Sequence, residues 1–180
     1  MAGTPIKLND GDIALYITPV QNYIDVNNRI LDYYITEQKF YCVYVTMNRP
    51  YTAMAELFKK RKLDLENVFF IDAVTPMHTS SIFRSGNAVF IGSPRNLTSM
   101  SIVLSSTMKN DGKRKILFLD SLSAMMIYNG AETGTKFMNH LISLMRMAKI
   151  SSVIISLEKE TDEKVLEQLS RMCDKVVEMK

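Results

Sequence analysis

Residues 115–123 read KILFLDSLS, and this stretch gives the strongest local signal in the chain. Its apolar run from Ile116 to Leu119 predicts a buried strand. The strand ends in an acid, Asp120, and is followed by the hydroxyl groups of Ser121 and Ser123. Open α/β sheets bind their ligands outside the carboxyl ends of the strands. Asp120, Ser121 and Ser123 are therefore the candidate ligand-binding residues.

Short apolar runs alternate with longer segments of helical period on both sides of this strand. Phe40–Thr46 is apolar on both faces, which is typical of a strand inside a parallel sheet. Helix starts are predicted at Ser93, before Pro94, and at Thr161. The pattern predicts an α/β fold with a doubly wound, mostly parallel central sheet flanked by helices in three layers. The predicted strands are 13–17, 40–46, 68–71, 88–91, 115–119, 153–157 and 175–178, and the predicted helices are 21–37, one that follows Pro50, 93–108, 135–148 and 161–172.

The composition is that of a single globular domain. The chain has 180 residues, of which 47% are apolar, enough to fill one sizeable core. Its net charge of +3 is too small to indicate nucleic acid by itself, and no apolar run approaches the ~20 residues that span a bilayer. We expect one domain over residues 1–180, in which the polar segment 1–11 is a flexible tail and not a signal peptide. Cys42 and Cys173 lie in apolar stretches and are expected to be reduced core thiols.

Three segments together resemble a known superfamily. Residues 115–123 resemble the Walker B strand of the RecA superfamily, especially its KaiC- and RadA-like branch. The segment YCVYVTMNRP at 41–50 is similar to the second strand of that branch and its turn, and VIISLEKE at 153–160 is similar to the strand after Walker B. The resemblance covers nearly the whole chain in element order. It implies a RecA-like fold, with Asp120 where the family holds Mg²⁺ beneath the nucleotide phosphates.

The turn after the first strand departs from the family. RecA-like ATPases carry Gly-x-x-x-x-Gly-Lys-Ser/Thr there, whose amides and lysine hold the phosphates. Residues 18–27 contain no Gly and no Lys, and Pro19 removes one backbone N–H. Asn22 is expected to cap the following helix, with the Asp25 carboxylate in capping-box position three residues later. A carboxylate at this positive helix end would repel a triphosphate.

The turn after the second strand departs as well. The resemblance places an acid that orients the attacking water where this chain has Asn48 and Arg49. An amide cannot act as a general base near neutral pH. The sequence therefore lacks the two parts that hydrolysis most needs.

These departures predict a non-hydrolysing regulatory or scaffolding domain, without catalytic residues, a metal or a cofactor. Its partner would be a protein, either a second copy or an intact RecA-like paralogue. The alternative is a nucleotide-binding switch or ATPase that holds ATP and Mg²⁺ in a non-standard site around Asp120, Ser121 and Ser123. A resemblance to P-loop-less relatives associated with archaea implies a cytoplasmic protein.

A second alternative is a nucleic-acid-associated accessory protein. It would use the basic clusters Lys59–Lys62 and Lys113–Lys115. Neither cluster is interleaved with exposed stacking aromatics, and the loop at 128–134 contains no basic residue. We therefore do not expect nucleic acid to be the partner.

An apolar run follows Asp120 at the same edge of the sheet. Met125, Met126, Ile127 and Tyr128 are predicted to form a surface that meets another protein chain. The competing interpretation is that these side chains fold inward under the helix at 137–148.

The two histidines give no metal or catalytic signal. His78 and His140 lie far apart in sequence, without ligands at the spacing of a metal site. The loop at 76–87, with Ser80, Ser81 and Ser85, contains no nucleophile motif and is interpreted as mobile or partner-facing.

Overall fold

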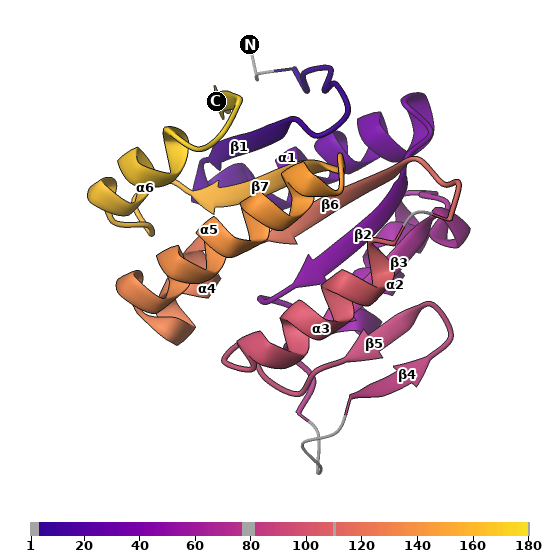
Figure 1. The fold of residues 1–180 in the computed structure, drawn as a ribbon. Coiled ribbons are helices and arrows are strands. Elements are labelled where there is room, and N and C mark those ends of the chain that lie inside the picture. The colour runs from indigo at the N-terminus through magenta and orange to yellow at the C-terminus, as the bar shows by residue number, and fades with distance from the viewer. Residues whose placement is uncertain (1–3, 77–81, 110, 180) are drawn as a thin grey trace.

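The computed structural model describes residues 4–76, 82–109 and 111–179. These residues form one eight-stranded sheet with helices on both faces (Figure 1). The strand order is β4-β5-β3-β2-β6-β7-β1-β8, and every neighbouring pair is parallel except β4 with β5. The predicted three-layer, doubly wound α/β fold is confirmed. The strands are β1 Ile13–Thr18, β2 Tyr41–Thr46, β3 Val68–Asp72, β4 Phe83–Ser85, β5 Ala88–Phe90, β6 Lys115–Asp120, β7 Ser151–Leu157 and β8 Lys175–Glu178.

The helices form the two outer layers. Helices α1 and α2 pack on one face of the sheet, and α3, α4, α5 and α6 pack on the other (Figure 1). Within the described ranges, none of them is long and apolar enough to cross a membrane. The helices are α1 Tyr23–Asp32, α2 Tyr51–Lys60, α3 Leu97–Thr107, α4 Leu122–Asn129, α5 Ala131–Met147 and α6 Glu163–Ser170.

The central strands are buried because both of their faces meet helices. All six residues of β6 are buried, and successive side chains point to opposite faces of the sheet. Leu117 and Leu119 belong to the core beneath α3–α6, whereas Ile116 and Phe118 belong to the core beneath α1 and α2. The apolar run read from the sequence therefore supplies both cores at once.

Two elements were missed by the sequence pattern. Helix α4 spans the run that contains Met125 and Met126, where residues 122–126 are all buried and leave no polar face to reveal a helical period. Gly130, with a φ of 77°, separates α4 from α5, so α5 begins earlier than predicted. Strand β4 has only three exposed residues and pairs with β5 as an edge hairpin.

The starts of two helices differ from the prediction. At α3, Asn96 rather than Ser93 is the N-cap, and its Oδ1 accepts a hydrogen bond from the Ser99 N–H at 3.2 Å. At α6, the cap is Asp162 rather than Thr161. Thr161 is buried and its hydroxyl is bonded inside the core, which leaves the capping to the next side chain.

Part of the segment expected to be a tail is packed against the sheet. Leu8 is only 2% exposed and joins the core beneath α1. The Ile6 N–H donates to the Tyr16 hydroxyl at 3.0 Å, and the Tyr34 hydroxyl donates to the Ile6 carbonyl at 2.6 Å. Residues 6–8 therefore belong to the domain rather than to a flexible tail.

Both cysteines are free thiols. Cys42 is fully buried in β2, and its burial raises the pKa of the thiol. Burial raises the pKa of Cys173 to about 12, with the nearby Asp174 charge acting in the same direction. Neither thiol is therefore ionised near neutral pH, as suits an unreactive structural cysteine.

The packing of Leu8 generates a stability prediction. Replacing Leu8 by Ala should lower the free energy of unfolding by about 2–4 kcal/mol, because it removes a buried side chain and leaves a cavity. Chemical denaturation measures this change. The exposed neighbour Lys7 is the control, since Lys7→Ala should change stability by less than about 0.5 kcal/mol. Equal effects of the two substitutions would show that the segment is a tail after all.

Candidate functional site

Asp120 ends β6 at the centre of the sheet. Its backbone pairs with Thr46 of β2 on one side and with Ile155 of β7 on the other. The residue is only 2% exposed. A carboxylate removed from water in this way needs several hydrogen-bond donors.

Three side chains supply those donors. The hydroxyl of Tyr23 donates to Oδ1 of Asp120, and the hydroxyl of Tyr44 donates to Oδ2. The Asn48 amide adds a third bond, from Nδ2 to Oδ1 at 3.3 Å. The carboxylate is therefore bonded from α1, from β2 and from the turn after β2.

Burial dominates the electrostatics of this cluster. It raises the pKa of the Asp120 carboxyl above its ordinary value of 3.8, although the three donors and the Arg49 charge act in the opposite direction. Burial, followed by the Asp120 charge, also raises the pKa of both Tyr23 and Tyr44. The tyrosines thus remain protonated donors throughout the physiological pH range.

Tyr23 lies in the segment that corresponds, in the resemblance described above, to the phosphate-binding turn of RecA-like ATPases. In this chain Pro19 leads into a single 3₁₀ turn, Val20–Asn22, and α1 follows at Tyr23. The space bounded by Tyr23, Tyr44 and Asp120 has a volume of only about 10 Å³. That volume is at the lower limit for one water molecule. This space is therefore too small for a phosphate.

The expected capping box at this helix start is not formed. Asn22 makes no side-chain capping bond. Asp25 instead forms an ion pair with Arg61, which lies beyond the end of α2, at 2.5 Å. Asp25 therefore ties α1 to the neighbouring helix instead of closing the end of α1.

Ser121 and Ser123 are also bonded within the protein. Oγ of Ser121 caps α4 by accepting from the Ala124 N–H at 3.2 Å, and it accepts from the Asn48 amide at 3.1 Å. Oγ of Ser123 accepts from the Leu157 N–H at 2.8 Å and lies 2.9 Å from the Thr161 hydroxyl. Both serines are fully buried. The structure thus brings Asp120, Ser121 and Ser123 to one edge of the sheet but uses all three to hold neighbouring elements.

The predicted contact surface is divided by α4. Met125 and Met126 are buried, and Met126 packs so closely that a Cβ added to Gly134 would lie 2.7 Å from its sulfur. These two methionines belong to the core, which corrects the expectation of a four-residue surface. Ile127 and Tyr128 are 68% and 42% exposed, so only this pair remains available to a partner.

The sequence pattern missed two residues of this edge. Tyr23 could not be identified from the sequence. No local pattern shows that a tyrosine at the start of α1 reaches Asp120 on β6, which is separated from β1 by β7 in the sheet. Asp72 ends β3 as Asp120 ends β6, and it is fully buried. Its carboxylate accepts from the backbone N–H groups of Tyr51, Val74 and Thr75. The signal for Asp72 was present in the segment VFFID, an apolar run that ends in an acid.

His140 does not contribute to the site. His140 lies on the exposed side of α5, and His78 lies outside the described residues together with Ser80 and Ser81. Within the described ranges, no group of three or more His, Cys, Asp or Glu side chains could hold a metal ion.

Comparisons with known proteins bear on the fold alone. No family model matches the sequence, and no curated protein matches it. Among solved structures, a KaiC-like protein from the hyperthermophilic archaeon Pyrococcus horikoshii OT3 matches with a TM-score of 0.67 at 10% identity. The match covers 94% of this chain and 71% of that chain. The chain therefore has a RecA-like fold similar to that of KaiC-like proteins.

The burial of Asp120 generates a pH prediction. Because its pKa is raised in the folded state, the protonated form is favoured by folding. This stabilising contribution is complete below the ordinary pKa of 3.8 and is lost as the pH rises through the raised value. The free energy of unfolding of wild type, relative to Asp120→Asn, should therefore fall as the pH rises across that interval.

Urea denaturation at a series of pH values measures this difference. Asp162→Asn is the control for a change of charge at an exposed helix start. If the stability of wild type relative to Asp120→Asn instead rises with pH, then the hydrogen bonds to Asp120, and not its burial, determine the direction of its pKa shift.

Proposed function

We propose that this domain does not hydrolyse ATP and acts as a regulatory or scaffolding domain through contacts with other proteins. The carrying observation is that Tyr23, Tyr44 and Asn48 all donate to the one carboxylate that a RecA-like site would turn toward Mg²⁺. Mg²⁺ is bound largely through the phosphates of its nucleotide and keeps several waters. The cavity of about 10 Å³ beside Asp120 admits neither.

The chemistry of the neighbouring residues supports the same proposal. A phosphate would need backbone amides from a glycine-rich turn and a lysine, and residues 18–27 supply neither. Asn48 points its amide at Asp120 and Ser121, so its nitrogen is a donor and cannot accept a proton from water. The residues at this edge therefore support neither the binding of a phosphate nor the activation of a water molecule.

The contact surface of the proposal is the exposed end of α4. Ile127 and Tyr128 lie there side by side in sequence, and the Asn129 side chain bonds to the Pro94 carbonyl at 3.2 Å and to the Met125 carbonyl at 3.1 Å. The pair thus presents apolar area from an anchored helix end. Tyrosine is enriched at protein interfaces because it joins apolar area to a polar hydroxyl. We propose a second copy of this chain as its partner, and a location in the cytoplasm.

The first prediction of this proposal concerns ATP. Phosphate release in the presence of Mg²⁺-ATP should not exceed the background without protein. The thermal midpoint should also stay unchanged, whereas a ligand at 100 times its dissociation constant would add about 2.7 kcal/mol of stability. Phosphate release that disappears in a folded Asp120→Ala variant would contradict the proposal and favour the nucleotide-binding alternative.

The second prediction concerns the end of α4. Changing Ile127 to Asp and Tyr128 to Ser should abolish self-association in analytical ultracentrifugation, because it replaces exposed apolar area by polar groups. The free energy of unfolding should change by less than about 1 kcal/mol, since both side chains are exposed. Ile102 on α3 is 56% exposed, and Ile102→Asp is the matched control that should leave self-association intact. A wild-type chain that stays monomeric, or an unfolded double variant, would contradict this assignment.

A further inference from the structure

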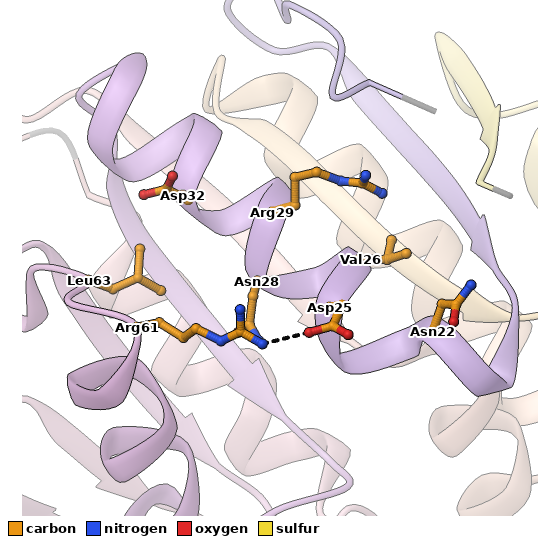
Figure 2. Close-up of a pocket in the computed structure, with 8 residues that line it drawn as sticks. All are labelled: Asn22, Asp25, Val26, Asn28, Arg29, Asp32, Arg61 and Leu63. Carbon is orange, nitrogen blue, oxygen red and sulfur yellow. Dashed lines mark hydrogen bonds and ion pairs between the residues drawn. The ribbon is translucent and has the colours of Figure 1, made fainter. Parts of the chain in front are cut away.

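A broad groove of about 540 Å³ lies between α1 and the segment that follows α2. Figure 2 shows its lining residues, which come from both segments. Neither Asp120 nor Tyr23 lines the groove, although Asn28 lines both the groove and the small space beside these two residues. The lining residues are Asn22, Asp25, Val26, Asn28, Arg29, Asp32, Arg61 and Leu63.

The groove has an apolar floor with one polar residue in it. Val26, Asn28 and Leu63 are 2%, 6% and 6% exposed, whereas the other lining residues are exposed and form the rim. The Nδ2 atom of Asn28 is buried and has no hydrogen-bond partner among the described residues. A buried amide without an acceptor destabilises the protein. An acceptor brought into the groove would remove that penalty.

The rim offers cationic donors that are incompletely used. The Nη2 atom of Arg61 bonds to Oδ1 of Asp25 at 2.5 Å (Figure 2). The pair is exposed on both sides, at 49% for the Arg61 side chain and 77% for the Asp25 side chain, so water screens it. Arg29 has no ion pair within the described ranges, although it lines the same groove.

The chain on both sides of Arg61 is positively charged. The lining itself is neutral, because Arg29 and Arg61 balance Asp25 and Asp32. Arg61 is flanked in the chain by three exposed lysines, Lys59, Lys60 and Lys62. Their positive charge exceeds the negative charge of the two nearby acids, Glu56 and Asp64. A run of cations next to a groove with free donors favours a ligand that carries several carboxylates.

We propose that this groove binds an acidic segment of a partner protein. Carboxylates of that segment replace Asp25 on Arg61 and pair with Arg29, while a polar group of its chain accepts a hydrogen bond from the Asn28 amide. In the free protein, Asp25 therefore occupies the position on Arg61 that a carboxylate of the partner takes in the complex. The inference rests on the proposed function in one respect, namely that the ligand of this domain is a protein.

Fluorescence anisotropy of a labelled hexaglutamate peptide, titrated with the full chain, tests the proposal. Arg61→Gln should weaken binding at least about fivefold, because it removes the bidentate donor of the rim. Asp25→Asn should tighten binding about two- to fivefold, the size expected when an exposed competing pair is removed. Raising the salt concentration should weaken binding to wild type.

A second ion pair provides matched controls. Glu167 on α6 and Arg171, which directly follows this helix, form an exposed pair at 2.6 Å, remote from the groove in sequence. Arg171→Gln changes the net charge as Arg61→Gln does, and Glu167→Gln changes it as Asp25→Asn does. Neither control should alter peptide binding by as much as twofold. Thermal denaturation of all four variants confirms that each remains folded.

Several outcomes would overturn the proposal. If Arg171→Gln and Glu167→Gln change peptide binding as much as the groove variants do, net charge alone attracts the peptide. Tighter binding of inorganic phosphate or of an oligothymidylate to the same residues would identify a different ligand. Absence of peptide binding, together with an inert ATP assay and self-association through Ile127 and Tyr128, would remove the groove proposal and leave the proposed function standing.

Discussion

Burial of one carboxylate constrains the whole carboxyl edge of the sheet. Asp120 is 2% exposed at the end of the central strand β6, and its two oxygens are met by Tyr23, Tyr44 and Asn48. A buried polar group that loses its hydrogen-bond partners costs a protein about 1–3 kcal/mol. The start of α1, strand β2 and the turn after β2 are therefore held at fixed positions around this side chain.

Neighbouring polar groups at this edge follow the same rule. Thr161 bonds to both Ser123 and Ser156, so that α4, β7 and the start of α6 are joined through buried hydroxyl groups. Asp72 holds the turn after β3 in the same way. The hydrogen-bonding capacity of these buried side chains is used within the protein. The Asn28 amide, which has no partner among the described residues, lines the groove along α1, and the exposed Ile127 and Tyr128 lie at the end of α4.

Elements with a strong local pattern were predictable from the sequence. Runs that are apolar on both faces marked the central strands, and the acid after 116–119 marked the edge of the sheet on which Asp120 lies. Edge strand β4 and helix α4 were not predictable, because three exposed residues and a fully apolar turn of helix carry no period. The resemblance to the RecA superfamily gave the correct fold because it rested on the order of these elements.

The pairing of polar side chains was decided by contacts between elements distant in the chain. The residues of the Thr18–Asn27 turn show that glycine and lysine are absent there, which is a local property of the chain. That Tyr23 reaches Asp120, 97 positions away, follows only when α1 packs beside β2 and β6. Likewise, Asp25 has the spacing of a capping box, yet it bonds to Arg61 because α2 ends within its reach. Local preference is worth about 1 kcal/mol for such a cap, and so tertiary packing can override it.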